Sequence, residues 1–222
     1  MAVPAPMTNP RSLLRFFFVF LLFAAAGLFI ATRLSPDFAY TTGEMLFGDR
    51  FHRYDAFIGE TARRHQVDPA LVKAVIWRES KFRPNMEGSS GERGLMQVGE
   101  SAAAEWAKAE RVATFVPTDL FDPKTNIEAG TWYLAQALKR WSEKDDPIPF
   151  ALAEYNAGRQ NVRRWVDDAR AREQERERQQ PGSTDSRVSG SELEDSISFP
   201  GTKSYVTAIR RRMEFFKARG RL

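Results

Sequence analysis

An all-α fold is predicted from three features of this sequence of 222 residues. Apolar residues recur at helical spacing along most of the chain, and two Asp-Pro pairs stand where helices would begin. No segment alternates with period two over enough residues to indicate a sheet. Hydrophobic residues make up 42% of the chain, which suffices for a core, so we expect a globular helical protein.

The first element is an uncharged apolar run at residues 16–32, preceded by two arginines and closed by Arg33. It is at the lower length limit for a membrane-spanning helix and slightly longer than the apolar region of most signal peptides. No convincing small-x-small cleavage site follows it. We therefore favour a membrane anchor within residues 1–33 over a cleaved signal segment, followed by a juxtamembrane linker at 34–50. The flanking arginines predict a single-pass inner-membrane protein whose remaining chain lies in the periplasm.

Helices are then expected in order, from start and stop signals and from apolar stripes. Asp68-Pro69 and Asp122-Pro123 each pair an N-cap with a first-turn proline, while Gly158 is typical of a helix end. Pro84 prevents easy continuation of the helix that begins at Pro69. The predicted helices occupy about residues 54–62, 69–80, 101–110, 123–141, 149–157, a segment containing Val162 and Trp165, and 203–217.

A polar stretch interrupts this pattern at residues 167–196, within a predicted catalytic domain at 51–217. It is rich in Arg, Glu, Gln, Ser and Gly. Glu/Arg pairs could extend the preceding helix through its first half. Residues 181–191 are predicted to form a mobile loop, because chain this polar has little apolar surface to bury.

Composition excludes several kinds of chemistry. The sequence has no Cys, which rules out disulfides, thiolate catalysis and zinc-thiolate sites, and its two His are too few for a convincing metal site. We therefore predict no metal and no cofactor. The net charge of +4 owes much to a C-terminal basic cluster, which could bind nucleic acid, anionic lipid or an anionic wall polymer, although a solvated helix face is the simpler interpretation. The cluster comprises Arg210, Arg211, Arg212, Lys217, Arg219 and Arg221.

Glu79 is the strongest candidate for chemistry. It ends a helix on the stripe that carries Val72, Val75 and Ile76, so its carboxyl lies against an apolar face. Burial disfavours the carboxylate form, and a Glu so placed can hold its proton near neutral pH and give it to a leaving oxygen. The Gly-flanked loop that follows, up to Gln97, lets backbone pass close to a ligand.

Five blocks in register resemble the soluble lytic transglycosylase family of peptidoglycan-cleaving enzymes, over roughly residues 51–216. They are Glu79-Ser80, Gly91-x-x-Gly-Leu-Met-Gln97, Asp122-Pro123-x-x-Asn126-Ile127, Tyr155-Asn156-Ala157-Gly158, and Ile197-Ser198-Phe199 with Thr202-Lys203-Ser204-Tyr205-Val206. The resemblance implies a lysozyme-like helical fold. It also implies cleavage of the β-1,4 bond between N-acetylmuramic acid and N-acetylglucosamine, with Glu79 as the single acid/base and 1,6-anhydro ends as product.

Further site residues follow from the same resemblance. Gln97 corresponds to the substrate-amide contact and Tyr155 to the tyrosine beside the catalytic Glu. Asn156 fixes a turn or touches sugar, and Ser80 holds the loop or simply ends the helix, which is the simpler role. Met96 and Tyr205 are expected in the pocket wall or the core.

The sequence departs from the family pattern at three positions. Gly88 stands where a Ser is common, which leaves Ser89 or its neighbour as the candidate hydroxyl. Gly201 replaces a family Glu. Glu154 replaces a small residue directly before Tyr155, and we hypothesise that it lines the sugar site and raises the pKa of Glu79, the alternative being a solvent-facing Glu.

Two other functions remain open on the sequence alone. A goose-type lysozyme-like muramidase would admit water and leave reducing ends, and a wall-binding scaffold would hold glycan without turnover. In each case peptidoglycan glycan strands are the expected partner, together with the inner membrane and wall-synthesis or secretion-assembly proteins. Nucleic acid is not expected, because export would separate the domain from it.

Overall fold

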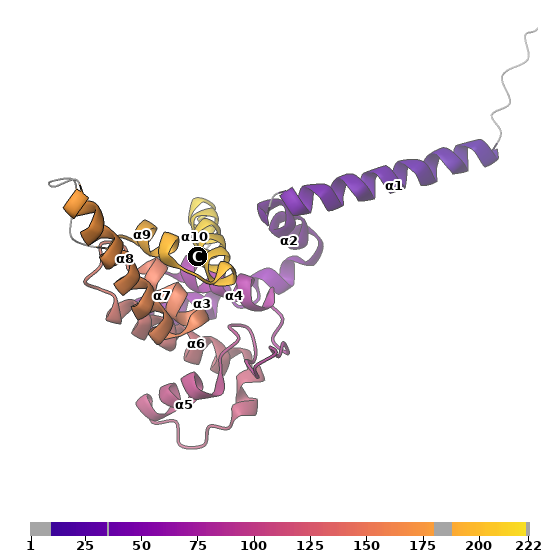
Figure 1. Cartoon of the computed structure of the whole chain (residues 1–222). Coiled ribbons are helices and arrows are strands. Elements are labelled where there is room, and N and C mark those ends of the chain that lie inside the picture. The colour runs from indigo at the N-terminus through magenta and orange to yellow at the C-terminus, as the bar shows by residue number, and fades with distance from the viewer. Residues whose placement is uncertain (1–9, 35, 180–187, 221–222) are drawn as a thin grey trace, which may run out of the picture. The chain divides into compact units, whose positions relative to one another are not determined.

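The computed structural model describes residues 10–34, 36–179 and 188–220, and the fold in these ranges is helical, as predicted (Figure 1). Apart from two isolated bridges at Glu87–Arg93 and Arg93–Val98, no β pairing occurs in them. The elements are α1 (Pro10–Leu34), α2 (Pro36–His52), α3 (Asp55–Arg64), α4 (Pro69–Ser80), α5 (Glu100–Ala109), the 3-10 helix η1 (Pro117–Phe121), α6 (Pro123–Arg140), α7 (Ile148–Ala157), α8 (Arg159–Gln179), α9 (Gly190–Ser196) and α10 (Pro200–Ala218).

The chain divides into two compact units, Met1–Arg50 and Phe51–Leu222. In the second unit α4 and α7 form the interior, and most of their residues are buried on all sides. The final helix α10 packs against both of them, while α6 packs against α7, α5 and α3 (Figure 1). A helix near the C-terminus therefore lies directly on one near the start of the unit.

The predicted helix signals act as expected. The Asp68 side chain caps α4 by accepting from Ala70 N at 2.8 Å, and Asp122 caps α6 by accepting from Thr125 N at 2.8 Å. Gly158 ends α7 with φ of +81°, a conformation that glycine adopts without strain. Each of these helices begins or ends within about two residues of its expected bound, since local chemistry decides its end.

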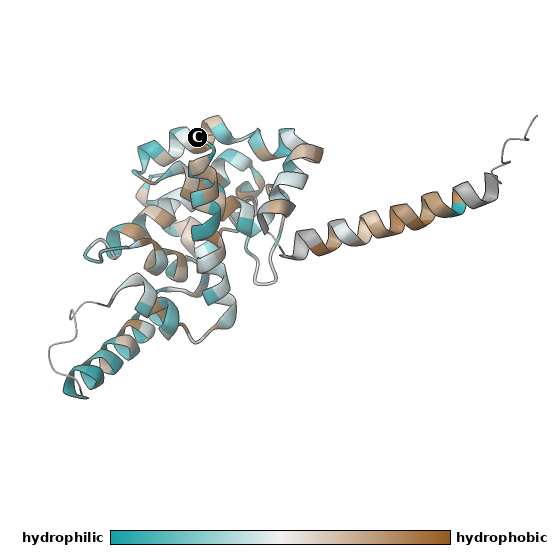
Figure 2. Cartoon of the chain, turned by 90° about the horizontal axis from the view of Figure 1, so that it is seen from above, coloured by the Kyte–Doolittle hydropathy of each residue, from teal (hydrophilic) through white to brown (hydrophobic). Residues whose placement is uncertain are grey.

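The first unit departs from expectation in two ways. Residues 34–50, expected as a linker, lie almost wholly in α2, which bends at Phe47 (φ −137°, ψ 37°). Over the ranges described here, no helix has both the length and the apolarity that crossing a membrane requires. The predicted span is thus unsupported, although α1 is largely hydrophobic (Figure 2).

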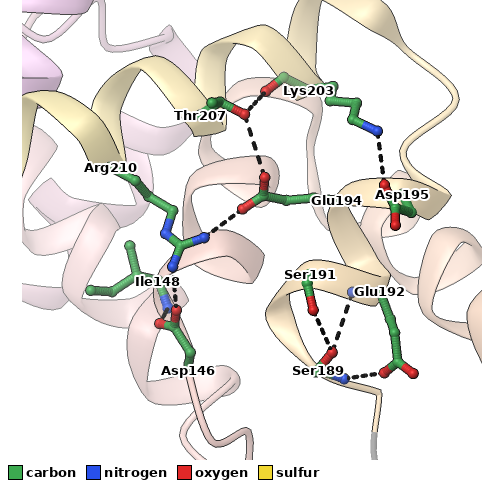
Figure 3. A network of polar contacts seen from close by, with 10 residues as sticks. All are labelled: Asp146, Ile148, Ser189, Ser191, Glu192, Glu194, Asp195, Lys203, Thr207 and Arg210. Atoms are coloured by element: carbon green, nitrogen blue, oxygen red, sulfur yellow. Dashed lines mark hydrogen bonds and ion pairs between the residues drawn. The ribbon is translucent and has the colours of Figure 1, made fainter.

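The expected insertion at 167–196 is more ordered than predicted. Helix α8 continues to Gln179, and α9 packs on α8 and α7 with Leu193 fully buried. Arg210 of α10 binds Glu194 of α9 at 2.7 Å and Asp146, two residues before α7, at 3.1 Å, which joins three parts of the domain (Figure 3). The sequence prediction overlooked the few apolar and charged residues that dock α9. Residues 181–187 of the expected mobile loop lie outside the described part of the chain.

Candidate active site

Glu79 occupies the last turn of α4, and the fold brings Tyr205 of α10 against it. Tyr205 is 2% exposed and its Oη donates a hydrogen bond of 2.6 Å to Glu79 Oε1. The two residues are 126 positions apart and meet because α10 packs along α4. From its sequence Tyr205 is expected only in the pocket wall or the core, and its contact with the carboxyl is a finding of the structure.

The surroundings of Glu79 raise its pKa from 4.5 to about 7. Removal of the carboxyl from water is the largest cause, because a partly buried site penalises the charged form. The Tyr205 hydrogen bond and the charges of Arg78 and Lys81 oppose this rise, and the charge of Glu92 adds to it. A substantial fraction of Glu79 is therefore protonated at neutral pH and can act as an acid.

The chain leaves α4 by a sharp turn beside Glu79. Lys81 and Phe82 both adopt positive φ, of 54° and 59°, which is unusual for residues other than glycine. Phe82 is completely buried and stacks near Trp77 and Phe51, with ring centroids 6.4 and 5.6 Å away. This aromatic packing stabilises the strained turn after α4. It thereby fixes the position of Glu79 at the end of that helix.

Asn126 of α6 anchors the loop that follows. Its Oδ1 accepts from Met96 N at 2.7 Å, and its Nδ2 donates to Arg93 O at 2.7 Å and to Leu120 O at 2.9 Å. Asn126 is fully buried, so each of these bonds replaces water at a backbone group. Gly94, at φ +81°, passes so close that a Cβ there would lie 2.3 Å from Asn126 Nδ2. The sequence had marked the Asn126 block without assigning this role.

The loop carries Gln97 directly after Met96, whose carbonyl contacts Tyr155 of α7. Gln97 Nε2 donates to Met86 O and Gly94 O, both at 3.0 Å, and Tyr155 Oη donates to Met96 O at 2.9 Å. Burial and then the charge of Glu79 raise the pKa of Tyr155 well above its usual value, which indicates that the phenol lies near that carboxyl. Met96 itself is fully buried.

Glu154 does not take the role that the sequence analysis proposed. Its carboxylate is 1% exposed, pairs with Arg140 Nη2 at 2.5 Å and accepts from Trp141 Nε1 at 2.8 Å. It is absent from the charged groups that shift the pKa of Glu79. Glu154 therefore neither lines a groove nor faces solvent, and instead joins α7 to the end of α6. It points away from the side of α7 that carries Tyr155, because neighbouring helix positions point about 100° apart.

Within the described part of the chain, the other site residues expected from the sequence make no hydrogen bond to the Glu79 carboxyl. Ser80 is buried and its Oγ donates to Ile76 O at 3.2 Å, as the helix-end interpretation expects. Asn156 is exposed, and its Oδ1 accepts from Thr202 Oγ1 at 2.7 Å, which joins α7 to α10. Ser89 is exposed in the loop. At Gly201, no atom lies within 4 Å of a built Cβ.

Three residues of the C-terminal basic cluster contact the rest of the fold, Arg211 and Arg219 are exposed, and Arg221 lies outside the described part of the chain. Arg210 makes the two ion pairs described above, and Lys217 binds Asp68 at 2.9 Å. Arg212 is 3% exposed and lies over the rings of Trp77 and Phe215, so it is not part of a solvated face. The part of the chain that the structure describes contains no group of three His, Cys, Asp or Glu residues suited to a metal ion.

Sequence comparison links this site to known proteins. The family model of the Transglycosylase SLT domain matches residues 56–177, which include Glu79, Gln97 and Tyr155. Membrane-bound lytic murein transglycosylase F of Desulfosudis oleivorans is 38% identical over 117 residues, covering 51% of this chain and 24% of that protein. The X polypeptide of Escherichia coli is 35% identical over 133 residues, covering 54% of this chain and 72% of that protein.

A longer but weaker similarity is to the soluble lytic murein transglycosylase of Salmonella typhimurium. It is 27% identical over 166 residues, covering 74% of this chain and 22% of that protein. This chain thus spans about a quarter of the length of the curated lytic transglycosylases cited here.

Solved structures share the fold. An inactive mutant of lytic transglycosylase Slt from Pseudomonas aeruginosa aligns with a TM-score of 0.65 at 22% identity, covering 90% of this chain and 29% of that one. The 70-kDa soluble lytic transglycosylase from Escherichia coli aligns with a TM-score of 0.57 at 23% identity, covering 78% of this chain and 24% of that one. At such identities the likeness concerns the fold alone.

Proposed function

The chain belongs to the transglycosylase SLT domain family, and on that premise we propose that it is a peptidoglycan lytic transglycosylase. Its substrate is the glycan strand, and the bond cleaved is the β-1,4 linkage between N-acetylmuramic acid and N-acetylglucosamine. The products carry 1,6-anhydromuramic ends. The observation that supports this proposal most is the placement of Glu79. Its carboxyl has a pKa of about 7 and accepts a hydrogen bond from Tyr205.

The first step is proton donation by Glu79 to the glycosidic oxygen. A pKa near the working pH allows the same group to be protonated in one step and to act as a base in the next. The hydrogen bond from Tyr205 orients Oε1 and leaves the other carboxyl oxygen available for the leaving group.

The second step returns the proton without water. Glu79, now a carboxylate, takes the proton of the muramic acid C6 hydroxyl, whose oxygen closes on C1 to give the anhydro ring. Other glycosidases need a second carboxyl as nucleophile or water activator. Here the substrate supplies the nucleophile, and its acetamido group can stabilise the cationic centre, so one acid/base residue suffices.

The neighbouring residues bind and orient the glycan. We assign Gln97 to the substrate amide, since its Nε2 is held by two carbonyls and its Oε1 can accept an N–H. Tyr155 lies beside Glu79 with its hydroxyl held by the carbonyl of the fully buried Met96, and Asn156 stabilises the α7–α10 junction. Ser80 ends α4, and we assign neither it nor the exposed Ser89 to the reaction.

The site of action follows from the substrate. We propose that residues 1–33 direct export, as an anchor or as a cleaved signal, and that the catalytic unit works on peptidoglycan in the periplasm, near proteins of wall synthesis or secretion. Cell fractionation with mapping of the mature N-terminus separates the two fates. Catalytic unit recovered only in the cytoplasm would contradict export altogether.

Product analysis tests the activity. Purified peptidoglycan is digested with the full chain, and the muropeptides are weighed. Anhydro ends are expected, whereas reducing ends would identify a water-using muramidase and an unchanged polymer that retains the protein would identify a scaffold. Glu79→Gln should lower the rate by about 10²–10⁴-fold or more, since the amide keeps the shape but carries no transferable proton. The exposed Glu110→Gln is the matched control and should retain wild-type activity.

A further inference from the structure

The loop beside the active site has a glycine whose missing side chain is replaced by another residue. A Cβ built on Gly88 would lie 2.4 Å from Glu92 Oε2 and 2.9 Å from Gln97 Oε1. Real Cβ contacts essentially never come under 3.0 Å, so no side chain fits at position 88 without displacing these groups. The Glu92 carboxylate and the Gln97 amide oxygen therefore lie around the same point.

Backbone contacts hold the Glu92 carboxylate in this position. Glu92 Oε2 accepts from Ser90 N at 3.1 Å, while Gly88 N donates to Glu92 O at 2.7 Å and closes the turn. Gly91 supplies the φ of +88° that the turn needs. The side chain thus folds back over Gly88 instead of extending into solvent, and Glu92 is only partly exposed.

The electrostatic surroundings of Glu79 give this carboxylate a role. From α4 and its end, Arg78 and Lys81 favour the charged form of Glu79, and from α10 the Tyr205 hydroxyl does the same. From α7, the Tyr155 phenol lies near Glu79 and contributes no charge, because its pKa is raised well above its usual value. Among the charged groups that shift the pKa of Glu79, Glu92 is the one that raises it.

We propose that Glu92 is a positioning residue of the active site, whose carboxylate lies next to Gln97 in the space that Gly88 leaves open and acts on Glu79 through its charge. Its negative charge counters part of the effect of Arg78 and Lys81 and adds to the rise in the pKa of Glu79 that burial causes. Together with Gln97 Oε1 it also presents a pair of hydrogen-bond acceptors, which suits the hydroxyl and acetamido N–H donors of an amino sugar.

Glu92→Gln tests the charge while keeping the shape and one acceptor. The kinetic readout of this inference rests on the proposed function. The titration of Glu79 is therefore also followed directly by ¹³C NMR of labelled glutamate side chains. The Glu79→Gln variant assigns the Glu79 signal. In Glu92→Gln the pH midpoint of the Glu79 titration should fall by roughly half a pH unit. The alkaline limb of the pH–rate profile should move to lower pH by the same amount. Glu110→Gln should move neither.

Gly88→Ala tests the geometry independently. Its Cβ expels the Glu92 carboxylate, so the midpoint of Glu79 should fall as in Glu92→Gln, and Gly88→Ala added to Glu92→Gln should cause little further change. An unchanged midpoint in Glu92→Gln, or an upward shift, would overturn the proposal. If wild type releases no muropeptide, the proposed function fails, while the NMR midpoints still decide the role of Glu92.

Discussion

The raised pKa of Glu79 has a consequence for stability that can be tested without substrate. The folded protein holds this proton up to about pH 7, whereas the unfolded chain releases it near 4.5. Between these values the folded state binds more protons, so the free energy of unfolding contributed by this group falls as pH rises, and the loss is complete above about pH 7. Glu79→Gln removes a group that must ionise in a partly buried site, and it should stabilise the fold at alkaline pH.

The size of this gain follows from the shift. Moving a pKa from 4.5 to about 7 corresponds to at most about 3 to 4 kcal/mol, and partial exposure of the side chain reduces this to roughly 1–2 kcal/mol. For a domain of this size each kcal/mol changes Tm by roughly 2–4 °C. At pH 8 the variant should therefore melt several degrees above wild type. At pH 4 the gap should nearly vanish, because wild-type Glu79 is then protonated in both states.

Thermal unfolding of both proteins from pH 4 to pH 8 measures the gap, and urea unfolding at the two extremes checks it. Gln is a fair replacement, because its carbonyl can still accept the hydrogen bond from Tyr205. Glu110→Gln, which removes an exposed charge, should show no pH-dependent gap. A difference in Tm between Glu79→Gln and wild type that is the same at every pH, or that grows as pH falls, would refute the reasoning.

Three further variants probe separate parts of the site. Tyr205→Phe removes the hydrogen bond that favours the carboxylate, so the pKa of Glu79 should rise above about 7 by roughly one unit, seen as a shift of the alkaline limb of the rate profile to higher pH; a shift to lower pH would contradict it. Asn126→Ala removes three hydrogen bonds to backbone groups, of which Arg93 O keeps a second partner in Val98 N, and should cost roughly 2–4 kcal/mol in urea unfolding, while a loss under about 1 kcal/mol would show that the loop is held elsewhere. Arg210→Ala should release α9 and speed proteolysis there without changing the pKa of Glu79; equal protection of α9 would show that its other contacts, such as the buried Leu193 and the Lys203–Asp195 pair, suffice to dock it.

Much of the site can be predicted from short-range patterns. Asp68-Pro69 and Asp122-Pro123 begin helices because capping involves only the next few residues, and Gly158 ends one for the same reason. The position of Glu79 on the apolar stripe of α4 was also sufficient to expect a raised pKa, because burial of that helix face follows from its periodicity.

Long-range contacts decided the rest. Periodicity cannot say which helix packs against α4, so it could not predict that the Tyr205 hydroxyl reaches Glu79, nor that Glu154 turns toward Arg140 and Trp141. The sequence by itself determined the helices and the acid that one of them carries, because these depend on neighbours within about four residues. Only the tertiary structure decided the partners of that acid and the position of the Glu92 side chain over Gly88. Both depend on packing between segments or within a loop, which no local sequence pattern encodes.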